Sequence, residues 1–260
     1  MVDENIFKNK PFFKEIYKRI YCEILEDIYS NTDNPQKILE IGSGGHGFIK
    51  EIDKKVITSD IEKHKNCDLV VNAECIPFEN ESLDAIIGIQ VLHHIINPSN
   101  FLHEAVRTLR HNGVIILFEP SYGLVSTLLH KFFHSEPFEK KQSFEDAMYS
   151  NKTNQAVSYI LFKKYKKKLF KQLPQLSVVK IKKRSFLEYI MSGGFHHKAY
   201  VPEKLITLFK GIDKLLMPFM GMLSIHQIII LKRKVLFNDN QETSDISSFN
   251  GNNDGLFGSP

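Results

Sequence analysis

The 260-residue sequence contains no tryptophan and only three cysteines, Cys22, Cys67 and Cys75. The cysteines are odd in number and unevenly spaced, and no two of them form a CxxC pair, so they support neither a disulfide framework nor a zinc site. This cysteine usage is typical of a reducing compartment, and we expect a cytoplasmic protein.

We also expect no segment for export or membrane insertion. The first residues, MVDEN, are acidic and polar, unlike a secretory signal. The longest stretch without formal charge, residues 215–231, contains Pro218, Gly221, His226 and Gln227. A spanning helix needs about 20 mostly apolar residues, so a helix end, a turn and a buried strand fit this stretch better.

The sequence has little net charge, since 34 basic residues face 30 acidic ones and leave +4. This balance does not by itself indicate nucleic-acid binding, and no aromatic-rich platform for single strands is present, so we expect no nucleic-acid partner. The length and the ordinary apolar content predict one domain over residues 1–237. Residues 238–260 are polar and rich in Gly, Asn and Ser, which predicts a disordered tail.

What is present is a rhythm of short apolar strands and helices. Strands are predicted at residues 37–41, 56–60, 69–71, 83–90 and 114–118, with helices at 6–30, after the glycines from 48, and at 99–110, the last ending at Asn112-Gly113. Strands that are apolar throughout indicate a parallel sheet covered on both faces. Residues 176–186 and 225–235 read as two further strands around a helix at 202–217.

The rhythm stops between residues 120 and 173, where helices are predicted at 123–133, 144–149 and 155–170. An insertion of this length is usually functional, and we expect residues 121–173, together with 187–202, to cap a site. The predicted fold is therefore α/β: a doubly wound, mostly parallel, seven-stranded Rossmann-like sheet with an antiparallel last strand and a helical insertion after the fifth strand.

The first strand runs directly into a glycine-rich loop, residues 42–47 (GSGGHG). Glycine permits a tight turn and lets a ligand approach the main chain, and a following helix would add unpaired N–H groups. Open α/β sheets bind ligands at this carboxyl end of their strands. The loop therefore predicts a cofactor site, although a tight turn without a ligand is the alternative interpretation.

Two acids flank the loop. Glu40 stands two residues before Gly42, and Asp60 ends the second strand, where it could accept hydrogen bonds from both hydroxyls of a ribose. Gly42, Gly44 and Gly47 also match the dinucleotide fingerprint, which leaves an NAD(P)-dependent oxidoreductase open. Glu40 would repel a pyrophosphate, however, and it suits a ligand that carries an ammonium and a sulfonium.

Three segments carry a family resemblance: residues 70–87 (VVNAECIPFENESLDAII), 90–95 (QVLHHI) and 101–114 (FLHEAVRTLRHNGV). Together with the glycine loop they resemble class I S-adenosylmethionine-dependent methyltransferases, and are similar to the ubiquinone-biosynthesis-like branch. Residues 119–120 (EP), 154–156 (NQA) and 192–195 (SGGF) look more loosely like methyltransferases encoded among surface-polysaccharide genes.

The resemblance implies S-adenosyl-L-methionine as the cofactor. The residues that it implies for the methionine end are Glu40, Gly42, Ser43, Gly44 and the adjoining Gly45; for the ribose, Asp60; for the adenine, Ile61, Asn72 and Ala73; and beneath the sulfonium, Gln90. The sequence departs from the family pattern at Asn72, where an Asp is usual, at His46, where a third glycine often falls, and at Asn112-Gly113, which replaces Pro-Gly-Gly.

His94, at the end of the fourth strand, is our first candidate for the proton acceptor, and Glu119 is the second; ordinary packing of His93 and His94 is the alternative. Candidate substrate-facing residues are Tyr122, Asn154, Gln155 and Ser192, which could equally cap helices and turns. No metal site is predicted, because the adjacent His196 and His197 would point to opposite faces of an extended segment.

Residues 163–184 contain ten Lys or Arg and no acid. Such a run is a solvated surface, or it attracts an anionic partner such as lipid headgroups or a sugar diphosphate. The sequence thus predicts methyl transfer to an O or N atom of a small-molecule, sugar or glycan-precursor acceptor, which could be lipid-linked, with peripheral contact at the inner face of a membrane. An oxidoreductase and a non-catalytic cofactor-binding relative are the alternatives.

Overall fold

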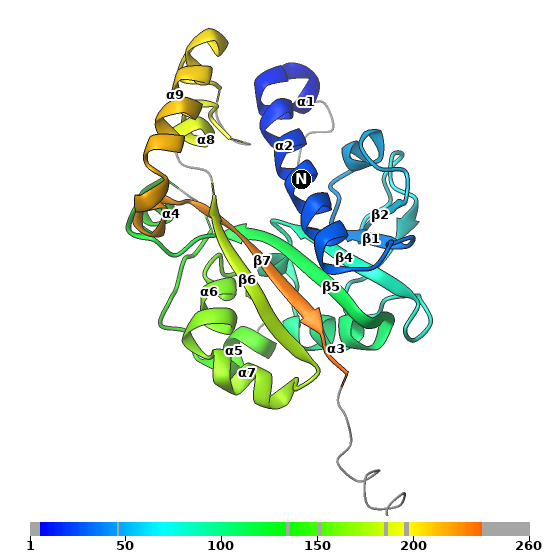
Figure 1. Ribbon diagram of the computed structural model, residues 1–260. Helices are drawn as coiled ribbons and strands as arrows, with labels where there is room; N and C mark the ends of the chain where they lie inside the picture. Colours follow the sequence, from blue (N-terminus) through cyan, green and yellow to red (C-terminus); the bar gives the residue numbers. More distant parts are fainter. Residues whose placement is uncertain are drawn as a thin grey trace, which may run out of the picture.

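The computed structural model describes residues 6–45, 47–133, 136–149, 152–184, 187–194 and 198–235. Seven strands form one sheet in the order β3-β2-β1-β4-β5-β7-β6 (Figure 1). Their bounds are β1 Ile38–Ile41, β2 Val56–Asp60, β3 Leu69–Val70, β4 Leu83–Ile89, β5 Leu109–Pro120, β6 Leu176–Arg184 and β7 His226–Arg233. β1 to β5 pair in parallel, and β7 is antiparallel to both of its neighbours, which confirms the predicted fold class.

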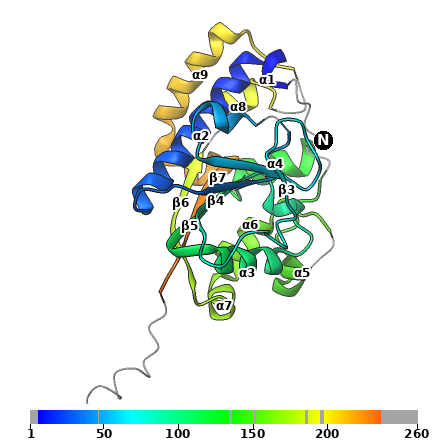
Figure 2. The same cartoon turned by 90° about the vertical axis from the view of Figure 1, so that its right-hand side faces the viewer.

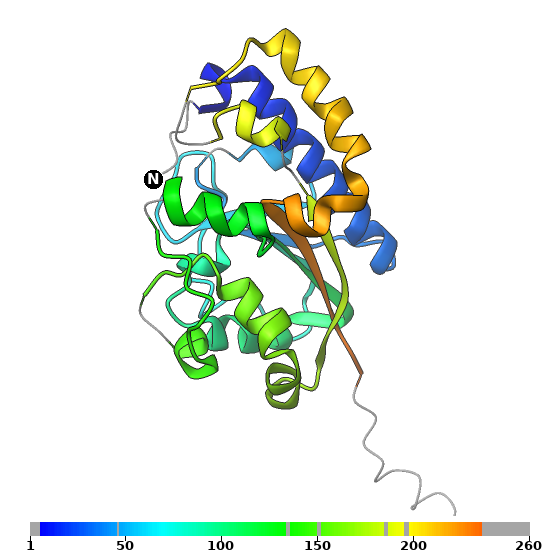
Figure 3. The ribbon, with the colours of Figure 1, turned by 90° about the vertical axis from the view of Figure 1, so that its left-hand side faces the viewer.

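Helices cover both faces of the sheet (Figure 2). One layer holds α1 Ile6–Asn9, α2 Pro11–Asn31, α8 Leu187–Met191 and α9 Glu203–Leu215. The other holds α3 Pro98–Thr108, α5 Phe144–Tyr149, α6 Val157–Tyr159, the π-helical η3 Ile160–Lys164 and α7 Lys166–Gln172. Figure 3 shows α4 Leu124–Phe133 between these layers, where it contacts α10 Met220–Leu223, which follows η4 Met217–Phe219.

The long helix α2 forms as its sequence predicts. Pro11 occupies the first helical turn, where its missing N–H is harmless, and apolar residues recur at helical spacing. This face is buried against one side of the sheet, where Ile24 and Ile28 belong to the same core cluster as Ile38.

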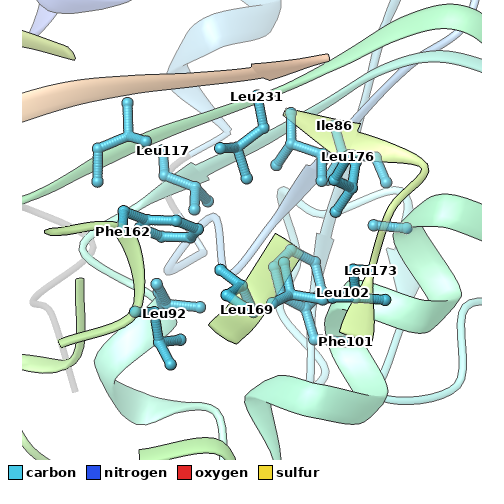
Figure 4. Packing of buried hydrophobic residues seen from close by; sticks show 14 of the residues in the cluster. Ile86, Leu92, Phe101, Leu102, Leu117, Phe162, Leu169, Leu173, Leu176 and Leu231 are labelled. Atoms are coloured by element: carbon cyan, nitrogen blue, oxygen red, sulfur yellow. The ribbon is translucent and has the colours of Figure 1, made fainter. Parts of the chain in front are cut away.

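The insertion supplies much of the opposite core. Phe162 and Leu169 lie in one cluster with Leu102 of α3 and the sheet residues Leu117 and Leu231 (Figure 4). Residues 144–149 and 152–173 therefore form a layer of the fold, because their apolar side chains pack against the sheet. We expected all of residues 121–173 to cap a site, whereas the structure leaves only the part before residue 144 for that role.

Three local expectations also differ from the structure. The helix expected after the glycines is only a 3-10 turn, η1 Phe48–Glu51, so it adds no long helix N-terminus to the loop. α3 ends at Thr108, and β5 already begins at Leu109, so the expected stop at Asn112-Gly113 lies inside a strand. None of the helices within the described ranges is long and apolar enough to cross a membrane. The predicted tail, residues 238–260, lies outside the described residues.

Candidate cofactor and acceptor site

The parallel strands β1, β2, β4 and β5 end at one edge of the sheet, and the predicted site residues gather there. Glu40 is the next-to-last residue of β1, Asp60 ends β2, Gln90 follows β4, and Glu119 is near the end of β5. This edge is where an open α/β sheet binds its ligands.

The loop after β1 is tightly held. Gly42, Gly44 and Gly45 have φ values of 65, 63 and 76°, a region that L side chains rarely adopt. The Ser43 N–H donates to the Ser59 carbonyl of β2 at 2.9 Å, and the Ser43 hydroxyl lies 2.9 Å from the Cys67 sulfur. A Cβ added to Gly42 would lie 2.4 Å from Cγ2 of Val91, so glycine is required at this position.

Glu40 is buried, with 1% of its surface exposed. Its Oε1 accepts a hydrogen bond from the Tyr21 hydroxyl at 2.7 Å, whereas its Oε2 has no hydrogen-bond partner among the described residues. Burial raises the pKa of Glu40 to about 7, with a further rise from the Asp60 charge, while the hydrogen bond from Tyr21 opposes both. An orphaned carboxyl oxygen in a buried site is stabilised by a ligand that brings a cation to it.

Asp60, at the end of β2, is hydrogen-bonded to the glycine loop. Its Oδ2 accepts from the Gly44 N–H at 2.9 Å, and its Oδ1 accepts from the Glu62 N–H at 3.1 Å. The acid thus fixes the glycine turn, and its charge adds to the rise in the pKa of Glu40.

Gln90 is the third unusual residue at this edge. It has a φ of 53°, and its backbone N–H donates to the Phe118 carbonyl at 2.8 Å. Its side-chain Nε2 is buried without a partner among the described residues. Positive φ in a non-glycine residue is strained, and such strain concentrates at functional sites.

These groups fit S-adenosylmethionine. The orphaned Glu40 oxygen is an acceptor for an ammonium, and the orphaned Gln90 amide is a donor for an acceptor group of the ligand. The glycines leave the main chain open to a ligand. At the expected adenine end, Ile61 is 66% exposed and free to cover a ring, Ala73 is partly buried, and the Asn72 Oδ1 already accepts from the Glu74 N–H at 2.9 Å.

On the acceptor side, Glu119 is fully buried and holds the short helix η2, Leu92–His94. Its Oε1 accepts from the N–H groups of Val91 and Leu92 at 3.0 and 2.8 Å, and its Oε2 lies 2.8 Å from Nδ1 of His93. The carboxylate is therefore used in positioning η2, and the structure gives it no free oxygen for the proton-acceptor role.

His93 and Glu136 are functional candidates that the sequence did not single out. His93 Nε2 lies 3.8 Å from Glu136 Oε2 and 3.3 Å from Gln155 Nε2, which also donates to Glu136. His94 Nε2 lies 3.9 Å from Glu136 Oε1. Burial and the neighbouring His93 lower the pKa of His94, against the opposing charges of Glu136 and Glu119. The structure thus joins the predicted His94, Glu119 and Gln155 in one cluster.

The other predicted substrate residues have contacts within the chain. The Asn154 Oδ1 accepts from the N–H groups of Glu139 and Ala156, both at 2.9 Å, and its Nδ2 donates to the Glu139 carbonyl at 3.0 Å. Ser192 is buried, and its hydroxyl donates to the Tyr189 carbonyl at 2.7 Å. These contacts shape a loop and a helix end, and substrate roles for both residues stay predictions.

Tyr122 follows β5 and lies against a half-buried lysine, Lys183. Lys183 Nζ is 3.4 Å from the centre of the Tyr122 ring, and it donates to Gln227 Oε1 at 2.8 Å and to Ser121 Oγ at 3.0 Å. Burial, with the charges of Lys163 and Lys140, lowers the pKa of Lys183 to about 7. Lys183, a member of the basic run, is therefore held by contacts within the chain and supports the segment that carries Tyr122.

Comparisons with known proteins agree with this geometry. Residues 39–117 match the family model described as a methyltransferase domain. No curated protein matches the chain. Among solved structures, the chain is similar to a SAM-dependent methyltransferase from Archaeoglobus fulgidus, at 17% identity and a TM-score of 0.50, covering 83% of this chain and 94% of that one. It is also similar to the YcgJ protein of Bacillus subtilis, at 15% identity and a TM-score of 0.43, covering 81% and 97%.

At 17% identity the Archaeoglobus fulgidus structure shows the fold alone. The family model covers the segment that contains the loop, Asp60, Gln90 and η2. The match favours a methyltransferase over the oxidoreductase interpretation of the glycine loop. Residues 39–117 are thus similar to a methyltransferase domain, and the fold is that of a SAM-dependent methyltransferase.

Proposed function

We propose that this chain is an S-adenosylmethionine-dependent methyltransferase that transfers the methyl group to an O or N atom of a small-molecule acceptor, of the sugar or glycan-precursor class. The observation that supports this most is the polar cluster of His93, His94, Glu119, Glu136 and Gln155 beside the cofactor loop. A hydroxyl or amine acceptor must lose a proton during transfer, and imidazole and carboxylate groups can take one.

S-adenosylmethionine supplies a methyl group on a positively charged sulfur that is already a good leaving group. The protein is left to bind, align and exclude water, and alignment alone can contribute about 7–11 kcal/mol. We assign the cofactor to the residues derived from the sequence: Glu40, Gly42, Ser43, Gly44, Gly45, Asp60, Ile61, Asn72, Ala73 and Gln90. We assign the acceptor to Gln155 and Tyr122, with Asn154 and Ser192 as further candidates.

The test is transfer of a labelled methyl group from S-adenosylmethionine to a cell extract that has been separated by size. Label in the small-molecule or lipid-linked sugar fraction would support the proposed acceptor class. Label only in protein or nucleic acid would contradict it, and no transfer to any fraction would leave the enzyme without an acceptor of this kind.

His94 is our proposed proton acceptor, and its replacement separates chemistry from binding. His94→Gln should lower kcat by about 10²–10⁴-fold, the contribution of a general base, while the Kd for S-adenosylhomocysteine stays the same. His111→Gln is the matched control, because His111 is also partly exposed beside a glutamate, 3.6 Å from Glu81, but lies at the opposite end of β5. Unchanged turnover in His94→Gln would remove His94 from this role.

We also propose peripheral contact with an anionic membrane through residues 163–184, although the structure reduces the charge available. Lys164 donates to the carbonyls of residues 140–142, Lys168 pairs with Glu145, and Lys182 and Arg184 pair with Glu23. The exposed cations that remain are Lys163, Lys166, Lys167, Lys171 and Lys180.

Membrane contact of this kind should depend on salt. We expect the protein to co-sediment with vesicles that contain anionic lipid at low ionic strength and to be released at high ionic strength. Replacing Lys166, Lys167 and Lys171 with Gln should abolish this binding. Equal sedimentation with neutral and anionic vesicles, or none with either, would contradict the proposal.

A further inference from the structure

Three atoms that can ligate a metal converge beside the cofactor loop. One ligand atom from each of His93, His94 and Glu136 lies within 4.8 Å of the other two. His93 Nε2 is 3.8 Å from Glu136 Oε2, and His94 Nε2 is 3.9 Å from Glu136 Oε1. Ligands at about 2.1 Å from a tetrahedral ion lie roughly 3.4 Å apart, so ligand atoms up to 4.8 Å apart must approach by up to about 1.4 Å to hold an ion. His94 and Glu136 are both partly exposed and can make this movement.

The buried side of this cluster already has the arrangement that supports a metal-bound histidine. Glu119 accepts two backbone N–H groups at Oε1, and its Oε2 lies 2.8 Å from Nδ1 of His93. This contact favours the tautomer with the proton on Nδ1, in which Nε2, 3.8 Å from Glu136 Oε2, has a lone pair to offer a cation. A carboxylate behind a histidine in this way fixes the tautomer and makes the outer nitrogen a better ligand.

Gln155 is a second and independent observation. Its side chain is buried, its Nε2 lies 3.3 Å from His93 Nε2, and its Oε1 has no hydrogen-bond partner among the described residues. A buried amide oxygen without a partner is unfavourable. Rotation of the amide would place this oxygen toward the cluster, where a cation would satisfy it.

The charges are also balanced for a divalent ion. Two neutral imidazoles, the Glu136 carboxylate and the Glu119 carboxylate behind His93 together offset a charge of +2. Imidazole and carboxylate ligands suit Zn²⁺ and its first-row neighbours rather than Ca²⁺ or Mg²⁺, which prefer oxygen ligands.

We propose that His93, His94 and Glu136 bind one divalent transition-metal cation, with Oε1 of Gln155 as an additional ligand. The binding itself does not depend on the acceptor, whereas a role for the cation in holding an acceptor oxygen rests on the proposed function. When the cation is bound, the lone pair of His94 is donated to it. His94 therefore serves either as a metal ligand or as the proton acceptor, and not as both at once.

Cobalt and zinc titrations of the chelator-treated full-length protein test the proposal. We expect one Co²⁺ per chain, with visible absorption bands that Zn²⁺ displaces. Glu136→Gln should weaken Zn²⁺ binding by more than the roughly 10–100-fold that loss of a residue supporting a ligand costs. Glu139→Gln, an exposed glutamate on the same loop, should bind like the wild type. His94→Ala, which replaces a half-exposed side chain, provides a second ligand variant if Glu136→Gln folds poorly.

The results separate this proposal from the proposed function. No cobalt bands in the wild type, or equal affinity in Glu136→Gln and Glu139→Gln, would overturn the metal site. A protein that binds no cation and still methylates a sugar would overturn it while the proposed function stands. Stoichiometric cation binding that depends on Glu136 would support it whichever acceptor is found.

Discussion

Glu40→Gln should weaken S-adenosylmethionine binding roughly 10- to 100-fold at pH 8, because a hydrogen bond to a charged group contributes about 1.5–3 kcal/mol. The Glu40 Oε2 is a buried acceptor with no partner among the described residues, and glutamine replaces the carboxylate with a neutral amide of the same size. Isothermal calorimetry on both proteins measures the change. Glu51→Gln, an exposed carboxyl that pairs only with Lys14, is the control and should bind normally.

The same variant should remove a pH dependence. Burial holds the pKa of Glu40 at about 7 in the free protein, so below that pH the carboxyl is protonated and must lose its proton to accept a cationic ligand. Affinity should therefore rise about tenfold between pH 6 and pH 8 in the wild type. The cofactor's own groups titrate equally in both experiments, so the difference in binding free energy between wild type and Glu40→Gln at each pH reports on Glu40 alone. Parallel pH profiles for the two proteins would contradict a role for Glu40 in binding.

Gly42→Ala should have the largest effect on the loop. The new Cβ would lie 2.4 Å from Val91 Cγ2, and the φ of 65° is one that costs an L residue about 1–2 kcal/mol. With overpacking of about 1–3 kcal/mol, we expect a loss of about 2–5 kcal/mol in the free energy of unfolding, measured by urea denaturation, and loss of cofactor binding.

A double variant separates the two causes. Gly42→Ala combined with Val91→Ala removes the overlap but not the strained φ, so stability should return in part. Gly211→Ala in α9 is the matched control, since a Cβ there meets no described atom within 4 Å, and it should stabilise the helix by about 0.5–1 kcal/mol. Wild-type stability in Gly42→Ala would show that the loop is not tightly packed.

Much of the fold follows from local patterns. The apolar strands at residues 38–41, 56–60 and 83–89 and the buried face of α2 were predictable, because burial on a fixed period constrains each residue by its immediate neighbours. The cofactor loop was predictable for a similar reason: four glycines directly after a strand permit few conformations other than a turn open to a ligand.

The acceptor side depended on residues far apart in the chain. Glu136 lies 42 residues after His94, in a loop without a motif of its own. Similarly, at the cofactor loop, Glu40 is contacted by the hydroxyl of Tyr21, which lies in helix α2. The sequence pattern also did not show that the helices of residues 144–149 and 152–173 would pack on the sheet. An amphipathic helix has the same spacing of apolar residues whether it packs on a sheet or covers a binding site.

The sequence by itself determined the apolar strands, the glycine turn and the acids beside it, since each of these is contained in a short stretch of chain. Only the tertiary structure decided that His93 is held by Glu119 and faces Glu136, and that half of the basic run is already paired. The physical reason is that a side chain's charge state and partners depend on what packs around it, and packing joins segments whose separation along the chain carries no local signal.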